Sequence, residues 1–437
     1  MGTILDVPQS VILRRWLFAL GFALTAIACW LLASGARRSV FITLFVPPIF
    51  ALFAYGRVRL FRQLASPLGP AARWGLLAAG IALDALMVAQ LLNARGGGWL
   101  NGSPLGWVGP VWFSAHALAL LGYGVLGLAR TAAWPWQWWR ARHAAPPARG
   151  ARLPDLGRRQ FLRQAGAFGA VTPFALSLTG VPLSYDFRVE ERELRIPGLP
   201  PALDGLRVAH LSDIHVGGAM DLDRLLRVAE LTNAARPDIV LHTGDFLTHR
   251  PGDFDAPLYE ALARIAAPHG QWACLGNHDY DDPERFCARL REAGVTPLRN
   301  RLVDVSVNGQ TLELGGLDFV SSRGPRAAAL RRAMADWPAR SAAPRLLLNH
   351  DPSGFEALPD GCASLVLSGH THGGHIGVQL GRDAALTVVG LAGLPDQGVF
   401  TRDDMRMYVT RCVGFYGYPM RMGIPPEIAL LVLRREV

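Results

Sequence analysis

Four long apolar stretches in the first third of the chain constrain its fold more than any other feature, because segments of this length and polarity are stable in a bilayer. They are Leu17–Gly35, Ser39–Tyr55, Trp74–Leu92 and Trp107–Leu128. As a helix, each is long enough to cross a hydrocarbon core of about 30 Å. We therefore expect residues 1–131 to form an all-α transmembrane bundle of four helices.

The arginines beside these stretches indicate how the helices are oriented. They gather before the first helix, between the second and third, and after the fourth, whereas the alternate loops hold only Arg37, Arg38 and Arg95. By the positive-inside rule, the amino terminus and the segment after the fourth helix are cytoplasmic. Asp84 and His116 lie near the middle of the third and fourth helices, so they either pair with each other or face other helices or bound water.

Residues 132–185 are expected to form a cytoplasmic basic linker that leads into a fifth span. Arg158 and Arg159 precede a Phe-Leu pair and a modestly apolar run, Ala165–Leu183. This order resembles a twin-arginine export signal and implies the twin-arginine export machinery as a partner. A small-x-small cleavage site followed by a break is not evident, so we expect an uncleaved signal anchor.

This segment also decides on which side of the membrane the rest of the chain lies. An export signal, or an ordinary fifth helix with a basic flank, would carry residues 186–437 across a bacterial inner membrane. The domain would then face the periplasm or the cell exterior, which is our expectation. If the weakly apolar run does not cross, the domain stays in the cytoplasm.

The distribution of charge argues against nucleic acid as a partner. Residues 1–185 hold 17 Arg and three acids, whereas residues 186–437 hold 27 Arg and 32 acids. The net charge of +9 is therefore a property of the first part, where cations flank apolar segments. The five cysteines are scattered and show no CxxC spacing, so neither a disulfide framework nor a zinc knuckle is indicated.

From Asp186 onward, short apolar runs alternate with amphipathic stretches, which favours an α/β domain. Two amphipathic stretches, Asp221–Ala235 and Pro257–Ala266, are suited to be covering helices. Open-sheet folds place their sites at strand ends, so we expect functional side chains there. The runs that read as buried strands are Leu206–Ser212, Ile239–Thr243, Gln271–Leu275, Arg345–Leu348 and Ala363–Ser368.

Each of these strands is followed by side chains that bind divalent metals. Carboxylates, amide oxygens and imidazoles are the ligands favoured by Mn, Fe, Zn and similar metals. Asp213, Asp245 and Asn277 are spaced 32 residues apart, about one strand, helix and strand, so consecutive parallel strands bring them to one edge. A glycine before Asp245, Asn277 and His370 permits a tight turn where a Cβ would crowd the metals. The strand ends read Asp213-Ile214-His215, Gly244-Asp245, Gly276-Asn277-His278-Asp279, Asn349-His350 and Gly369-His370-Thr371-His372.

These motifs, D-x-H, GD, GNHD, NH and GHTH, resemble those of the calcineurin-like metallophosphoesterase superfamily. The sequences around the motifs are similar to those of the bacterial membrane-associated phosphodiesterase branch of this superfamily. They read LSDIHVG, HTGDF, LGNHDY and SGHTHGGH. The resemblance covers residues 186–437, and five motifs in the right order make it specific. It implies a layered β-sandwich flanked by helices and a hydrolase of phosphoric ester or anhydride bonds.

The resemblance also implies two divalent metal ions, with Mn, Fe, Zn and Mg open as their identity. Two cations with a shared anion lower the pKa of a bridging water, and the resulting hydroxide attacks phosphorus in line. His278 would donate a proton to the leaving oxygen, and Asp279 would either orient that imidazole or cap the following helix. The resemblance implies that one metal is bound by Asp213, His215 and His372 and the other by Asn277, His350 and His370. It implies that Asp245 bridges the two metals.

Alternatives stay open for the substrate and for catalysis itself. The substrate is a phosphorylated small molecule or lipid, cleaved as a phosphodiester or a pyrophosphate; a UDP-diacylglucosamine pyrophosphatase-like reaction of lipid A synthesis, at the cytoplasmic face, is one alternative. Another is a non-catalytic metal- or ligand-binding sensor, against which the full set of seven ligands argues. Thr248 replaces the tyrosine that purple acid phosphatases carry three residues after the bridging Asp, which disfavours a tyrosinate-bound ferric ion. His249 and His375 are candidates for substrate contact.

Overall fold

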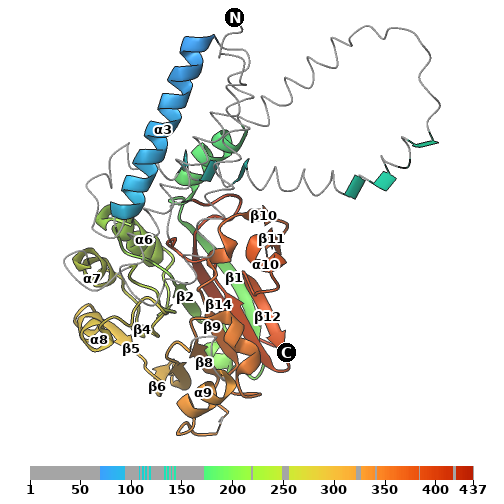
Figure 1. Ribbon diagram of the computed structural model, residues 1–437. Coiled ribbons are helices and arrows are strands. Elements are labelled where there is room, and N and C mark those ends of the chain that lie inside the picture. The colour runs from blue at the N-terminus through green and yellow to red at the C-terminus, as the bar shows by residue number, and fades with distance from the viewer. Residues whose placement is uncertain are drawn as a thin grey trace, which may run out of the picture. The chain divides into compact units, whose positions relative to one another are not determined.

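The computed structural model describes residues 69–93, scattered positions between 108 and 143, and residues 172–436 apart from gaps at 218–219, 249–254, 321–325, 340–341, 383 and 417–419 (Figure 1). The chain divides into two compact units. One comprises residues 1–92 and 104–178, and the other comprises residues 93–103 and 179–437.

The expected membrane region is described only in part. Helix α3, Pro70–Asn93, covers the third expected span, and residues 172–183 are helical at the end of the fifth. Judged by length and apolar character, no helix among the described residues qualifies as a membrane span. The first two spans, the twin-arginine motif and the side chains of Asp84 and His116 lie outside the described residues, so the transmembrane bundle stays a prediction.

The second unit is built on two six-stranded mixed sheets. The first sheet has the order β1-β14-β2-β3-β4-β5, in which β14 runs antiparallel to β2 and the other neighbours are parallel. Its strands are β1 Arg188–Ile196, β2 Arg207–Leu211, β3 Ile239–His242, β4 Gln271–Ala273, β5 Val295–Pro297 and β14 Glu427–Arg435.

The second sheet has the order β12-β13-β9-β8-β7-β6. Its four central strands are parallel, and β12 and β6 pair antiparallel with their neighbours at the two edges. The strands are β6 Arg301–Val307, β7 Gln310–Gly316, β8 Arg345–Leu348, β9 Leu365–Ser368, β12 Gly398–Arg402 and β13 Met405–Val409.

Apolar side chains from both sheets form one buried cluster, so the sheets pack face to face as a sandwich. Leu241 of β3, Leu348 of β8 and Leu367 of β9 are fully buried in this cluster. A second cluster lies between the first sheet and α6 Leu222–Ala234, α7 Ala256–Leu262 and α8 Pro283–Glu292, which Figure 1 shows along one side of the domain. A third joins the second sheet to α9 Arg326–Ala333 and to the 3-10 helix η3 Pro352–Ala357. The α/β sandwich with flanking helices is therefore confirmed.

The five predicted strands occur as β2, β3, β4, β8 and β9, and the two predicted helices occur as α6 and α7. The helix over Asp221–Ala235 begins where expected because the Asp221 side chain accepts a hydrogen bond from the Arg224 amide and caps it. The helix predicted over Pro257–Ala266 is shorter, because α7 ends at Leu262.

A small hairpin module follows the last ligand motif. It comprises η4 His372–Gly374, β10 Gly377–Gln379, β11 Ala385–Thr387 and α10 Val388–Leu391, of which β10 and β11 pair antiparallel. A further 3-10 turn, η2 Pro201–Leu203, connects β1 to β2.

Candidate metal centre

The loops after five strands converge at one edge of the sandwich. Strands β2, β3 and β4 are parallel neighbours, so they bring Asp213, Asp245 and Asn277 to the same edge of the first sheet. The loops after β2 and β3 are joined directly, because the amide of His215 donates to the carbonyl of Asp245 at 3.1 Å. The second sheet contributes through β8 and β9, where the Gly369 amide donates to the His350 carbonyl at 3.0 Å.

One cluster of potential ligand atoms surrounds Oδ1 of Asp213. His372 Nε2 lies 3.2 Å from this oxygen and His215 Nε2 lies 3.8 Å from it. His215 Nε2 is also 3.6 Å from Oδ2 of Asp245. All four side chains are buried.

A second cluster surrounds Nε2 of His350. Asn277 Oδ1 lies 3.2 Å from this nitrogen, His370 Nδ1 lies 3.1 Å from it, and Asp245 Oδ2 lies 3.3 Å from it. Oδ2 of Asp245 therefore faces both clusters, while Oδ1 of Asp245 accepts a hydrogen bond from the His278 amide at 2.8 Å. The structure thus brings together all seven ligands predicted from the sequence, with Asp245 between two groups of three.

The second cluster fits a cation at its centre. The ring nitrogen Nδ1 of His350 lies 2.6 Å from the Thr243 carbonyl, which can only accept, so Nδ1 carries the proton. In the neutral ring, the lone pair of Nε2 then points at the oxygens of Asn277 and Asp245, an arrangement that needs a positive charge. Against the opposing effect of burial, the carboxylates of Asp245 and Asp213 raise the pKa of His350 to about 10.

The first cluster fits a cation for a different reason. Oδ1 of Asp213 and Nε2 of His215 are buried and have no hydrogen-bond partner among the described residues. A buried polar atom without a partner costs about 1–3 kcal/mol, so a bound cation would remove a real penalty. Ligand atoms about 2.1 Å from a metal lie roughly 3.0–3.4 Å from one another, which is close to most of the separations here. The Asp and His clusters can therefore hold divalent metal ions.

The ligands sit on strained backbone. Asp213, His215, Asp245, His370 and His372 all adopt positive φ angles, between 50° and 68°. Such angles are uncommon for residues other than glycine and persist only where surrounding structure enforces them. Backbone strain of this kind is typical of functional sites, so it supports a functional role for these loops.

Asp279 is one of the groups that enforce this backbone. Its buried carboxylate accepts hydrogen bonds from the amides of Asp245 at 2.8 Å, Gly276 at 2.9 Å, Phe246 at 3.0 Å and Leu247 at 3.3 Å. The alternative in which Asp279 caps the next helix is wrong, because Asp282 caps α8. Both oxygens of Asp279 are occupied by backbone amides of the two ligand loops rather than by the imidazole of His278.

Close packing explains the glycines that precede the ligands. A Cβ on Gly276 would lie 2.1 Å from Oδ1 of Asp245, and a Cβ on Gly369 would lie 2.3 Å from Oδ2 of Asp213. A Cβ on Gly244 would lie 2.1 Å from the Gly276 amide nitrogen. Any larger residue at these three positions would push a ligand loop out of place.

Three residues that were not predicted from the sequence, Cys412, Ser212 and Arg421, support the first cluster. The thiol of Cys412 donates to Oδ2 of Asp213 at 3.1 Å, and Ser212 and the His370 amide donate to the same oxygen. Burial raises the pKa of Cys412 well above its ordinary value, so it stays a thiol. Arg421, fully buried, donates to the carbonyls of Gly414, Cys412 and His372.

His278 lies at the rim of the centre. Its ring centroid is 5.1 Å from that of His215 and 4.7 Å from that of Tyr416, whose side chain is 53% exposed. Burial lowers the pKa of His278, an effect opposed by the charge of Asp245. A partly exposed imidazole beside the ligand clusters is positioned to exchange a proton with a molecule bound there.

The remaining candidates take other positions. Thr248 turns its hydroxyl to the carbonyl of His215 at 3.0 Å. The His375 ring lies 4.7 Å from that of His372, and its Nδ1 is 3.2 Å from the Met420 carbonyl. His249 lies outside the described residues. His210 and His242, two histidines near the motifs to which no role was assigned, are buried in the core.

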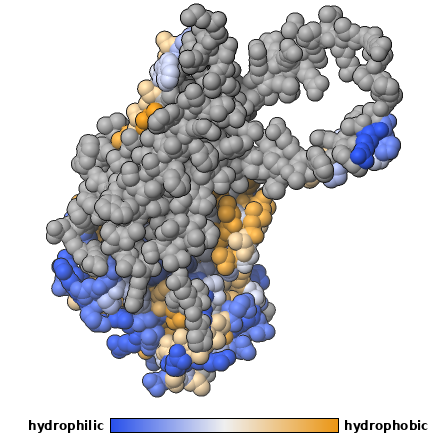
Figure 2. Space-filling model, in the orientation of Figure 1, coloured by the Kyte–Doolittle hydropathy of each residue, from blue (hydrophilic) through white to orange (hydrophobic). Residues whose placement is uncertain are grey.

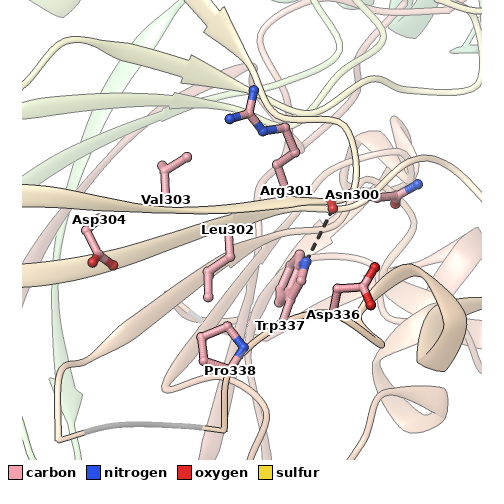
Figure 3. A pocket seen from close by; sticks show the side chains of 8 residues that line it. All are labelled: Asn300, Arg301, Leu302, Val303, Asp304, Asp336, Trp337 and Pro338. Carbon is pink, nitrogen blue, oxygen red and sulfur yellow. Dashed lines mark hydrogen bonds between the residues drawn. The ribbon is translucent and has the colours of Figure 1, made fainter.

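A shallow pocket on β6 is separate from the ligand clusters. It has a volume of about 320 Å³, and its lining includes Asn300, Asp304, Trp337 and Pro338 (Figure 3). The indole nitrogen of Trp337 donates to the Asn300 carbonyl at 3.2 Å. None of the seven ligand candidates lines this pocket, so it does not belong to the metal centre.

Comparison with known proteins gives the same family that the five ligand motifs resemble. Residues 206–374 match the calcineurin-like phosphoesterase family. A zebrafish (Danio rerio) transmembrane protein with metallophosphoesterase domain is 30% identical over 64% of this chain and 67% of its own length. Phosphodiesterase YaeI of Escherichia coli is 28% identical over 52% of this chain and 82% of its own. The UDP-2,3-diacylglucosamine pyrophosphatase LpxG of Chlamydia muridarum is 24% identical over 54% of this chain and 86% of its own.

The matched residues include every ligand motif, and the zebrafish relative is covered over two thirds of its length. The chain belongs to the calcineurin-like metallophosphoesterase family, a family of hydrolases that act on phosphate esters.

Proposed function

We propose that the protein is a membrane-anchored phosphoesterase that uses two divalent metal ions to hydrolyse a phosphodiester or pyrophosphate bond. The observation that carries this proposal is Oδ2 of Asp245, which lies 3.3 Å from His350 Nε2 and 3.6 Å from His215 Nε2. One carboxylate oxygen between two groups of nitrogen and oxygen ligands suits a pair of metals rather than a single one.

The ligands divide between the two metals. Asp213, His215 and His372 would hold one metal, Asn277, His350 and His370 would hold the other, and Asp245 would bridge them. Mixed imidazole and oxygen ligands suit Mn, Fe or Zn better than Mg. When bound, such a pair supplies a nucleophile at neutral pH and neutralises charge on the phosphoryl oxygens.

The residues around the ligands have separate tasks in this proposal. His278 donates a proton to the oxygen of the leaving group, which its place at the rim allows. Asp279 positions the loops of Asp245 and Asn277. Cys412 and Ser212 hold Oδ2 of Asp213, which leaves Oδ1 of Asp213 for the metal.

The membrane part of the proposal rests on the sequence and on a relative. We propose a four-helix region over residues 1–131, a basic linker with a signal anchor over residues 132–185, and the catalytic domain over residues 186–437. The printed name of the zebrafish relative, a transmembrane protein with metallophosphoesterase domain, supports an anchored enzyme. A periplasmic or extracellular catalytic domain follows from the positive-inside rule together with a crossing fifth span.

The name of the Chlamydia relative favours a second candidate, hydrolysis of a UDP-diacylglucosamine-like pyrophosphate. That reaction takes place on the cytoplasmic face, so the side on which the domain lies separates the two. Alkaline phosphatase and green fluorescent protein fused in turn to the carboxyl terminus would report that side. Only the green fluorescent protein fusion should be active if the domain lies in the cytoplasm, whereas an active alkaline phosphatase fusion, which needs disulfides, would place the domain outside it.

The function itself is tested with the full chain purified in detergent and supplied with Mn²⁺. Phosphomonoesters, phosphodiesters and lipid pyrophosphates are offered separately, with Asp245→Asn as the inactive control and Asp304→Asn, an exposed position on β6, as the matched active one. Hydrolysis of a diester or a pyrophosphate that Asp245→Asn abolishes is the expected result. Absence of hydrolysis of every class, with metals bound, would support the sensor alternative.

A further inference from the structure

An exposed apolar surface covers the hairpin module that follows the His370–His372 motif. Figure 2 shows apolar side chains gathered at the place where Figure 1 labels β10, β11 and α10. Within the described part of residues 179–436, Tyr416 is the one large exposed apolar residue outside residues 377–394. We call the six others the apolar hairpin surface: Val378 at 58% exposure, Leu380 at 68%, Leu386 at 51%, Val388 at 61%, Leu391 at 74% and Leu394 at 48%.

This surface is held in place rather than left on a loose loop. Strands β10 and β11 pair in register, with Val378 opposite Leu386. The Thr387 hydroxyl donates to the Asp396 carboxylate and caps α10 by accepting from the Gly390 amide at 2.9 Å. Aliphatic side chains gathered on a rigid support and turned to solvent indicate a contact surface.

The apolar hairpin surface is attached to the metal centre. The Thr371 hydroxyl, between His370 and His372, donates to the Asp396 carbonyl at 2.9 Å. Gly374 packs so closely on Thr387 that a Cβ there would lie 2.8 Å from the Thr387 Cβ. Whatever binds this surface is therefore held beside the two ligand clusters.

The chain enters the domain at the base of the same hairpin. The Gly180 carbonyl, near the end of the expected anchor span Ala165–Leu183, accepts from the Arg421 amide at 3.0 Å. The next residue, Met422, donates to the His375 carbonyl at 2.9 Å and accepts from the Gly377 amide of β10 at 2.9 Å. A span that ends at Leu183 thus leaves the membrane next to β10.

Positive charge lies at the turn of the hairpin. Arg382 is exposed between β10 and β11, and the guanidinium of Arg192 donates to the Arg382 carbonyl. Aliphatic side chains beside arginine are the combination that binds the headgroup boundary of an anionic bilayer.

We propose that the apolar hairpin surface rests in the headgroup boundary of the phospholipid bilayer that holds the anchor, and that it keeps the metal centre at the membrane surface. This inference rests on the proposed anchored phosphoesterase and narrows its substrate to an amphiphile, a phosphate ester or anhydride attached to an acyl chain. The scissile phosphate of such a molecule stays at headgroup depth, which is the depth at which this surface would hold the ligand clusters.

The test uses the full chain in nanodiscs of phosphatidylethanolamine and phosphatidylglycerol. Leu391→Cys carries a bimane fluorophore, and Arg331→Cys on α9 is the matched control. The described cysteines Cys274, Cys287, Cys362 and Cys412 are buried, and the labelled parent chain supplies the background. Doxyl-labelled lipid should quench most of the fluorescence at position 391 and little at position 331, whereas aqueous iodide should do the reverse.

Two outcomes overturn the proposal. If iodide quenches both positions alike and doxyl lipid quenches neither, the surface faces water. If position 391 is shielded from both quenchers, protein covers it, either a second copy or another segment of this chain.

A measurement of hydrolysis distinguishes a failure of the membrane-contact proposal from a failure of the enzyme proposal. The double variant Leu386→Gln, Leu394→Gln should hydrolyse soluble bis(4-nitrophenyl) phosphate within about twofold of the parent rate, while a label at position 391 should lose its contact with doxyl lipid. Quenching at position 391 can be read without any turnover. If the enzyme is active but position 391 lies in water, the membrane-contact proposal is overturned and the enzyme proposal stands.

Discussion

The carboxylate of Asp279 accepts a hydrogen bond from the backbone amide of Asp245 at 2.8 Å. The same carboxylate accepts from Gly276, so the loops that carry the proposed bridging aspartate and Asn277 meet on one buried side chain. Asp245 is held there with a φ of 51°, a conformation that costs about 1–3 kcal/mol outside glycine. Asp279 therefore acts on the geometry of the ligands.

Replacing Asp279 by Asn should weaken metal binding. The change removes the negative charge and turns one acceptor into a donor that faces backbone amides. We expect metal affinity to fall about 10- to 100-fold and the free energy of unfolding of the metal-free protein to fall by about 2–3 kcal/mol. Calorimetric Mn²⁺ titration and urea unfolding measure the two effects, with Asp304→Asn as the neutral control. If Asp279 acted on His278 instead, kcat would fall while metal affinity kept its parent value.

The Cys412 thiol should matter as a hydrogen-bond donor to Asp213. Cys412→Ser keeps a donor within reach of Oδ2 of Asp213, whereas Cys412→Ala removes it. We expect the alanine variant to bind Mn²⁺ about tenfold more weakly and the serine variant to stay near the parent. Metal titration of the two variants side by side checks this, and equal affinities would remove the role given to the thiol.

Loss of the His278 imidazole should leave metal binding unchanged and slow proton transfer to the leaving group. The ring of His278 packs beside that of His215, but the hydrogen bond of His278 to a ligand comes from its backbone amide, which alanine retains. We expect His278→Ala to keep its full metal content and to cleave esters with poor leaving groups about 10²- to 10⁴-fold more slowly. Esters of 4-nitrophenol, which leaves without a proton, should be affected much less. An equal loss for both kinds of ester would contradict the assignment.

Acid should destabilise the domain through a histidine that is not a ligand. Burial lowers the pKa of His242 from 6.5 to about 4, although its hydrogen bond to Gln271 opposes the shift. Between these values the unfolded chain binds a proton that the folded protein does not, so the free energy of unfolding falls as pH falls. The contribution is about 1.4 kcal/mol per pH unit. Urea unfolding of His242→Gln between pH 4 and 6.5 should show a pH dependence that is shallower by this amount; an unchanged slope would show that His242 does not titrate in this way.

The sequence was sufficient where the signal was local. Strands β3 and β8 are short runs, buried at every position, that lead within one residue to Gly244-Asp245 and directly to Asn349-His350, so their type and their ends were readable. Their division between two sheets was not readable. Nothing local distinguishes β3 of the first sheet from β8 of the second, because that choice depends on which strands pair across the whole domain.

Contacts between residues that are distant in the sequence could not be predicted either, because they also depend on the fold of the whole domain. Cys412 lies 199 residues from Asp213 along the chain, and nothing beside it indicates a contact with a carboxylate. Asp279 has a local motif that suggests chemistry beside His278, yet three of its four partner amides are 32 to 34 residues away. Such roles depend on how loops from different strands meet.

Anomalous diffraction from crystals grown with Mn²⁺ would locate the proposed pair of metals. Two anomalous peaks separated by about 3.5–4 Å are expected, one near Asp213, His215 and His372 and the other near Asn277, His350 and His370. The Asp245 carboxylate should lie between the peaks. A single peak, or two peaks that do not share Asp245, would contradict the paired-metal centre.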